Sequence, residues 1–199
     1  MENEMIFVRI ATRNDLKYVQ EILDETQASA IARGTGIAKR DPATIVAKIV
    51  EGKAVIALTL IGEWVGFSYL QLWEDGDFVS NSGLIVNPKY RKSGVASAIK
   101  ERIFKMSRRL YPQAKIFSIT SGTAVMKLNY KLGFRPVGFS EITRDKNFWK
   151  GCEGCENHDI LQRKGHANCL CTAMLFEPVE IGTENIIEAG KEIALYLHH

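Results

Sequence analysis

Hydrophobic residues recur along the chain with two periods, and each period predicts a different kind of element. Apolar runs bounded by glycine, proline or acidic turns predict strands over 5–11, 54–60, 64–73, 78–86, 115–121, 134–143 and 169–177. Apolar residues three and four apart predict helices, most clearly from Ser93 onward, where one face carries Val95, Ile99, Ile103, Met106 and Leu110. Strands with interspersed helices predict a mixed α/β (α+β) fold.

Capping residues predict where several helices begin and end. Thr12, followed three residues later by Asp15, forms a capping-box-like start. Asp41 before Pro42 predicts a second start, with the helix ending near Gly52. A short helix over 123–133 is expected to end on its last glycine. Residues 183–197 predict a C-terminal helix.

Composition narrows the class of protein. With 199 residues, 46% of them hydrophobic and 25% charged, the chain reads as a single domain over 1–199. The net charge of +3 does not by itself imply a nucleic-acid partner. The longest apolar run, "AVIALTLIG", is about half of a membrane span, and the first residues lack a secretory pattern. We therefore expect a cytoplasmic protein with no membrane partner.

The junction "VNPKYRKSGVASAIK" is the most informative stretch for function. A predicted strand stops at Pro88, and a short basic loop ending in Gly94 leads at once into the long helix. Backbone N–H groups at a helix start, with a glycine that allows close approach, form an anion site. Arg91 and Lys92 would supply countercharge for a pyrophosphate. The alternative is an ordinary loop with solvated basic residues.

The context of this loop carries a resemblance. With the motifs "RKSGVA" and "NYKLGF", residues 5–177 resemble the GNAT superfamily of acyl-CoA-dependent N-acetyltransferases. The resemblance implies a mostly antiparallel, twisted sheet flanked by helices, and acetyl-CoA or another acyl-CoA as co-substrate. It implies that the pantetheine arm pairs with Leu84, Ile85 and Val86 as an extra strand would. It further implies that the pyrophosphate is held by backbone amides of Arg91, Lys92, Ser93, Gly94, Val95 and Ala96.

The catalytic acid is less clear from the sequence. The family usually protonates the leaving thiolate with a tyrosine five residues before the phenylalanine of "LGF". That position is Asn129 here, and the neighbouring tyrosine is Tyr130. One residue along a helix is a rotation of about 100°, so Tyr130 points elsewhere and can equally be a packed aromatic residue. Both residues stay candidates, and no general base is assigned.

A second group of polar residues is a candidate acceptor site. The stretch "ARGTGIAKR" places Arg33 and Arg40 near two glycines, in the region where the family binds its acceptor. Such basic residues suit an acceptor with carboxylates, and the best candidate is an acidic amino acid such as glutamate. Asn81 and Ser82, just before the expected coenzyme strand, are further candidates. A solvated basic loop is the alternative, and a protein amine remains an open acceptor.

The chain's four cysteines all lie within residues 148–171, where we expect an insertion of about 144–168 between the last two strands. Cys152-x-x-Cys155 and Cys169-x-Cys171 have a spacing that suits a tetrahedral four-thiolate zinc site. Four thiolates leave no open position, so the zinc would be structural and would hold the loop beside the acceptor. The alternatives are four reduced thiols, or a histidine in place of one thiolate.

Three function classes follow from these observations. The first is an N-acyltransferase that moves a short acyl group from coenzyme A to a small-molecule amine. The second is a catalytically silent acyl-CoA-binding or regulatory module, which the displaced tyrosine favours. The third is a zinc-dependent nucleic-acid binder. Only the basic residues of "KMSRRLYPQAK" support it. Whether the protein forms a homodimer stays open.

Overall fold

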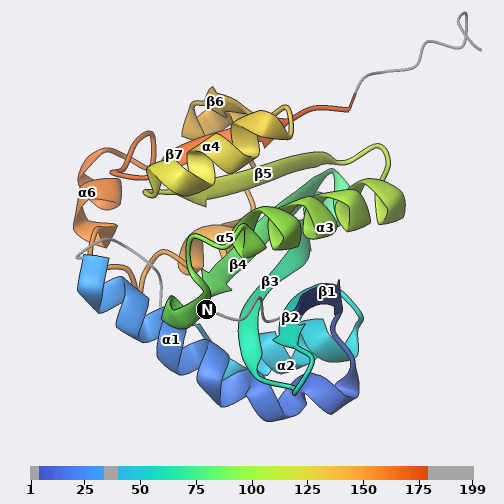
Figure 1. The fold of residues 1–199 in the computed structure, drawn as a ribbon. Helices are drawn as coiled ribbons and strands as arrows, with labels where there is room; N and C mark the ends of the chain where they lie inside the picture. Colours follow the sequence, from blue (N-terminus) through green and yellow to red (C-terminus); the bar gives the residue numbers. More distant parts are fainter. Residues whose placement is uncertain (1–4, 34–39, 179–199) are drawn as a thin grey trace, which may run out of the picture.

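The computed structural model describes residues 5–33 and 40–178, which form a seven-stranded sheet with helices on both faces (Figure 1). The strand order is β1-β2-β3-β4-β5-β7-β6. Neighbouring strands are antiparallel except β4 and β5, which run parallel. The strands are β1 (Ile6–Ile10), β2 (Ala54–Thr59), β3 (Trp64–Trp73), β4 (Phe78–Val86), β5 (Lys115–Thr120), β6 (Arg135–Val137) and β7 (Thr172–Phe176). This architecture confirms the predicted mixed, mostly antiparallel fold.

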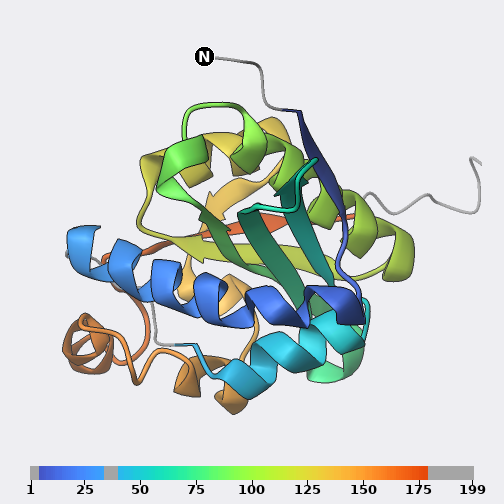
Figure 2. The ribbon, with the colours of Figure 1, turned by 60° about the horizontal axis from the view of Figure 1, so that its bottom comes forward.

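Helices cover the two faces of the sheet unequally (Figures 1 and 2). Helices α1 (Val19–Arg33) and α2 (Pro42–Val50) pack on one face of β2 and β3, where Ile56 and Phe67 are buried. Helix α3 (Val95–Leu110) crosses the opposite face and buries Val55 and Ala57. Because β2 and β3 are covered on both sides, their sequences are nearly continuous apolar runs.

The predicted caps are present. The Asp15 carboxylate accepts a hydrogen bond of 2.7 Å from the Thr12 backbone N–H, at the start of a short 3-10 helix (Arg13–Tyr18) that leads into α1. Asp41 accepts a bond of 3.1 Å from the Ala43 N–H at the start of α2. Gly133 follows α4 (Thr123–Lys131) with a left-handed φ of +86°. These sequence signals therefore located three helix ends.

Several predicted boundaries were wrong. The strand expected over 134–143 is only β6, after which a 3-10 helix (Phe139–Glu141) buries Phe139. The last strand begins at Thr172, so Cys169 and Cys171 precede it. The insertion is not a loop without elements, because it contains α5 (Lys146–Lys150) and α6 (His158–Arg163). Leu110 is 45% exposed at the end of α3, where the sheet no longer covers it. The helix predicted over 183–197 lies outside the described residues.

Candidate functional site

A gap in the sheet organises the site. Strands β4 and β5 pair at only three positions, from Phe78–Lys115 to Ser80–Phe117, although β4 continues to Val86. Beyond Ser80 the two strands separate. A cavity of about 380 Å³ occupies the separation, and both strands line it, β4 with residues 80–85 and β5 with residues 117–120. Backbone groups of β4 on this side are therefore free to bind an extended ligand.

A bulge in β4 helps to turn the strand away from β5. Pairing with β3 shifts between Phe67–Ile85 and Tyr69–Ser82, so β4 holds one extra residue. Gly83 lies in the bulge with a left-handed φ of +65°. A Cβ atom at Gly83 would lie 2.6 Å from a ring carbon of Tyr69. Glycine is therefore required both by the backbone and by the close approach of the ring.

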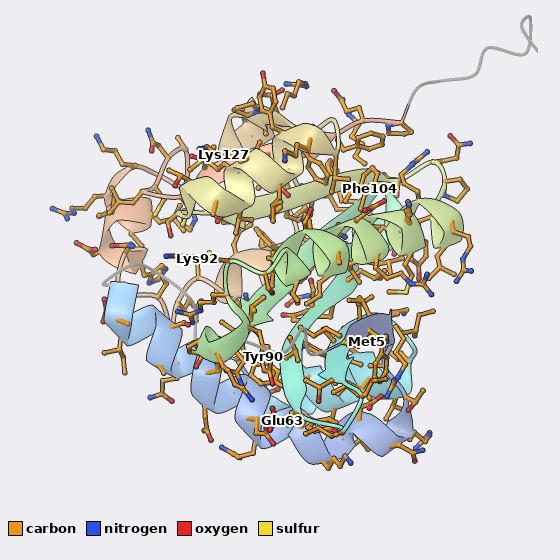
Figure 3. All side chains as sticks on the ribbon, viewed as in Figure 1. Met5, Glu63, Tyr90, Lys92, Phe104 and Lys127 are labelled. Atoms are coloured by element: carbon orange, nitrogen blue, oxygen red, sulfur yellow. The ribbon has the colours of Figure 1, made fainter. Side chains whose placement is uncertain are left out.

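The loop between β4 and α3 supplies a concave backbone. Lys92 and Gly94 have left-handed φ values of +66° and +87°, and α3 begins directly after Gly94. Alternating backbone conformations of this kind turn successive N–H groups toward one point, which suits an anion. Figure 3 shows Lys92 on this loop, at the N-terminal end of α3. Ser93 donates a hydrogen bond of 2.6 Å to the Tyr90 carbonyl and so stabilises the turn.

Arg91 is already engaged by α1. Its guanidinium Nη2 donates to the Glu25 carboxylate at 2.6 Å and to the Ser29 hydroxyl at 2.8 Å, and its Nε donates to the Val86 carbonyl at 3.2 Å. The expected countercharge from Arg91 is therefore partly neutralised by Glu25. Arg91 instead ties α1 to the loop. Its backbone N–H donates to the Pro88 carbonyl at 3.3 Å, so this amide of the expected anion site is already engaged.

Several of the other sequence-predicted residues line the cavity, whereas Val86 and Val95 do not and are buried in the core beside α3. Leu84, Ile85, Asn81, Ser82 and Arg40 line the cavity. The Nδ2 of Asn81 donates to the Ser107 hydroxyl at 2.8 Å, and its buried Oδ1 has no hydrogen-bond partner within residues 5–33 and 40–178. Arg33 ends α1, but its side chain lies outside the described part of the structure. Four further residues line the cavity: Tyr69, Gln71, Lys100 and Asp41, of which the sequence singled out only Asp41, and only as a helix cap.

Arg40 enters the cavity from the loop before α2. Its guanidinium lies 5.9 Å from the centroid of the Tyr69 ring. Its Nε is buried and has no hydrogen-bond partner among the described residues. Arg40 also lowers the pKa of the Cys152 thiol, against the larger effects of burial and neighbouring cysteines. A buried guanidinium donor without an acceptor is suited to bind a carboxylate.

The two candidate catalytic residues on α4 occupy opposite environments. Asn129 is fully buried, and its Nδ2 donates to the Met174 sulfur at 3.5 Å. Its Oδ1 is buried and accepts no hydrogen bond from any residue that the structure describes. Tyr130 is 68% exposed, and it is not among the residues that line the cavity. The one-residue offset therefore turns Tyr130 to solvent and Asn129 into the core, and neither residue lines the cavity.

Lys100 is a buried cation in this site. It lies on α3, is only 2% exposed, and lines the cavity. Its Nζ lies 5.2 Å from the centroid of the Phe134 ring. Burial lowers the pKa of Lys100 to about 7, and no carboxylate in the described part of the chain counteracts this effect. The sequence did not indicate that Lys100 is buried, because this residue follows Ile99 and lies one position outside the apolar stripe of the helix.

The four cysteines are unpaired thiols beside the same cavity. Burial, together with neighbouring cysteines, raises the pKa of Cys152 to about 11 and that of Cys171 to about 12. The Asn157 backbone joins the two pairs, because its N–H donates to the Cys155 sulfur at 3.4 Å and its carbonyl accepts from the Cys169 thiol at 3.8 Å. Within residues 5–33 and 40–178, no group of three or more His, Cys, Asp or Glu side chains is arranged to hold a metal ion.

Comparison of the sequence with protein-family models gives no match, and comparison with curated proteins gives none either. Solved structures are similar. N-acetylglutamate synthase from Neisseria gonorrhoeae, complexed with coenzyme A and N-acetyl-glutamate, has a TM-score of 0.61 and 14% identity; the match covers 89% of this chain and 36% of that one. Rv2747 from Mycobacterium tuberculosis, complexed with CoA, has a TM-score of 0.59 and 19% identity over 86% of this chain and 98% of its own.

A third similar structure is that of an enzyme named for a protein substrate. The ribosomal-protein-S18-alanine N-acetyltransferase from Escherichia coli has a TM-score of 0.56 and 14% identity over 89% of this chain and 97% of its own. Together these comparisons confirm that the chain has the fold of GNAT acetyltransferases. No helix in the described part of the chain has the length and apolar content of a membrane span.

Proposed function

We propose that the protein is an acyl-CoA-dependent N-acyltransferase that transfers an acetyl or other short acyl group to a primary amine. The observation that carries this proposal is the open gap between β4 and β5, together with the concave Lys92–Gly94 backbone that follows β4 in the chain at the start of α3. The gap offers strand-like backbone pairing to a pantetheine arm, and the turn offers N–H groups to a pyrophosphate. The similar structures that contain coenzyme A support the proposal.

The residues present would divide the work as follows. Backbone groups of Leu84, Ile85 and Val86 would hold the pantetheine, and the thioester carbonyl would be polarised by an N–H of the same strand. A neutral amine from the opposite end of the cavity then attacks the carbonyl carbon. The C–N bond forms, the C–S bond breaks, the nitrogen gives up one proton to solvent, and the leaving thiolate takes up a proton.

We propose an acidic amino acid such as glutamate as the acceptor. The buried, unsatisfied Nε of Arg40 supports a carboxylate in this part of the cavity, and Asn81 offers a buried amide oxygen. The similarity to N-acetylglutamate synthase agrees with this acceptor. A protein N-terminus is the alternative, because the fold is also that of an enzyme which acetylates a ribosomal protein.

The first experiment is thiol release from acetyl-CoA and succinyl-CoA, measured with acidic, neutral and basic amino acids, spermidine and an alanine-starting peptide. Release that is fastest with L-glutamate or L-aspartate supports the proposal as stated. Thiol release only with the peptide would show that the acceptor is a protein N-terminus and not an acidic amino acid. Bound coenzyme without release for any amine would favour the silent binding module.

Arg40→Gln tests the acceptor assignment. A charge-assisted hydrogen bond is worth about 1.5–3 kcal/mol, so the variant should raise the KM for glutamate by roughly 10- to 100-fold. The KM for acetyl-CoA should stay unchanged. Arg13→Gln, on the exposed 3-10 helix before α1, is the matched control. An equal KM for glutamate in both variants would contradict the role of Arg40.

We also propose that the four cysteines bind a structural zinc ion. The support is their common location beside one cavity and the mutual effect of their charges on the pKa values of Cys152 and Cys171. Their thiols would have to lose protons and move closer together on binding. Metal analysis of the purified protein should find about one zinc per chain, and Cys155→Ser should release it. A metal-free protein with full activity would contradict this proposal.

A further inference from the structure

Lys100 is in a position that the packing of a protein core does not explain. The apolar stripe of α3 buries Val95, Ile99 and Ile103 against the sheet, and Lys100 adds a cation at 2% exposure beside it. Among the described residues it forms no hydrogen bond and no ion pair, and burial is the only influence on its pKa. Burying an ammonium group without a partner is costly, and a buried polar group of this kind indicates a function.

Lys100 faces the gap between β4 and β5. It lines the cavity with β4 and β5, whose cavity-lining residues carry no charge. The titratable groups that line the rest of the cavity are Arg40, Asp41, Tyr69, His158 and the four cysteines, and none of them shifts the pKa of Lys100. On α4, Lys127, Tyr130 and Lys131 are exposed to solvent, so none of the three packs against it.

The position does not suit a phosphate contact. Lys100 lies six residues after Gly94, which is about 9 Å further along the helix axis than the concave turn. It lies instead beside Phe134, whose N–H donates to the Asn129 carbonyl at 3.1 Å. Lys100 therefore approaches, from α3, the region where the sequence resemblance expects an acid on α4. Asn129 has no ionisable group and cannot act as an acid, and Tyr130 is exposed to solvent.

We propose that Lys100 is the general acid that protonates the coenzyme A thiolate as the acyl group leaves. This inference rests on the proposed N-acyltransferase function. The ammonium Nζ gives one proton to the sulfur as the C–S bond breaks, and Lys100 becomes neutral. The proton that the attacking amine loses on becoming an amide passes to solvent, and solvent returns a proton to Nζ. A pKa of about 7 allows both states near neutral pH.

Lys100→Met tests this role because methionine keeps the length of the side chain and removes the proton. Positioned acids contribute typically 100- to 10,000-fold, so kcat with acetyl-CoA and the fastest amine of the panel should fall at least about 100-fold. The KM for acetyl-CoA and its Kd by calorimetry should change less than about threefold. The alkaline fall in the pH profile of kcat should vanish in the residual activity. Lys105→Met, an exposed site on the same helix, should match the wild type in all readouts.

Lys100→Arg separates proton donation from charge. An arginine keeps the positive charge but does not release its proton, so this variant should be as slow as Lys100→Met while still binding coenzyme A. An active Lys100→Arg variant would overturn proton donation. So would a Lys100→Met variant that changes only the KM for acetyl-CoA, or one with kcat within threefold of wild type. A wild-type protein that binds acetyl-CoA but is silent with every amine would overturn this role and the proposed function together.

Discussion

Two buried charges of this protein affect its stability in opposite ways. Arg9 and Asp15 form a bidentate pair with two N–O distances of 2.7 Å, and each charge is compensated by the other. Lys100 is as buried as Asp15 and has no carboxylate partner among the described residues. A paired buried charge is destabilising to remove, whereas an unpaired one is destabilising to keep. The two sites therefore predict opposite effects of neutralising a charge.

Neutralising Lys100 should stabilise the protein. The pKa of Lys100 is lowered from its ordinary value of 10.5 to about 7, so between these pH values the unfolded chain binds more protons and wild-type stability rises with pH. The penalty is greatest below pH 7, at about 1.4 kcal/mol for each unit of lowering, and disappears above pH 10.5. Urea denaturation of Lys100→Met should thus show a larger gain at pH 6 than at pH 10. An equal gain at both pH values would contradict the lowered pKa.

Asp15 should make the protein sensitive to acid. Burial would raise its pKa, but hydrogen bonds from Arg9 and Thr12 outweigh that effect and hold the pKa below the ordinary 3.8. Stability from this carboxylate is complete above that ordinary value and is lost as the pH falls through the lower folded-state pKa. Asp15→Asn should lower the free energy of unfolding by about 2–4 kcal/mol at pH 7. The loss should shrink toward pH 2, where an undiminished loss would exclude the charge as its cause.

At the scale of elements, the sequence predicted what local signals control. Capping residues and apolar periods located α2, α3 and the long strands β3 and β4, because their patterns are set by contacts within one element. Strand β6 was overestimated, since its length depends on pairing with β7 far along the chain. The pairing of Arg91 with Glu25 joins residues 66 positions apart, so no local pattern indicated it. Lys100 escaped because a single lysine beside an apolar stripe usually faces water.

The bulge in β4 gives a test at this scale. Gly83 and Gly52 both have left-handed φ values, but a Cβ atom at Gly52 would meet nothing within 4 Å. Gly52→Ala should therefore cost only the backbone strain, about 1–2 kcal/mol. Gly83→Ala adds the clash with Tyr69 and should cost more, while also weakening coenzyme A binding. Denaturation and calorimetry of both variants measure the difference. An equal loss of stability in both variants would show that the Tyr69 ring moves aside without an energetic cost.

At the scale of the whole molecule, the sheet is divided by its own gap. Strands β1 to β4 form one part and β5, β7 and β6 the other, joined along only three residue pairs. Helix α3 spans both parts, because its core cluster contains residues of β2 to β4 together with Ile116 and Met174. The molecule therefore depends on α3 and on the short paired segment to keep its two parts aligned.

Coenzyme A should stabilise the whole molecule. At a ligand concentration of 100 times the Kd, binding adds about 2.7 kcal/mol, which corresponds to a Tm rise of roughly 5–10 °C for a chain of this size. Hydrogen exchange should slow mainly in β4 residues 81–86. Adenosine 3′,5′-bisphosphate, which lacks the pantetheine, is the control and should not protect β4. Equal protection by both ligands would contradict pairing in the gap.

The interrupted pairing of β4 and β5 has a consequence for the timing of a catalytic cycle. An extended ligand in the gap acts as a temporary cross-link, so the main-chain network is continuous only while the site is filled. Product departure must break a set of strand-like hydrogen bonds together, which is a slow event compared with the loss of a single contact. Separation of the ligand from β4 should therefore be slow, and raising the solvent viscosity should lower the dissociation rate of coenzyme A.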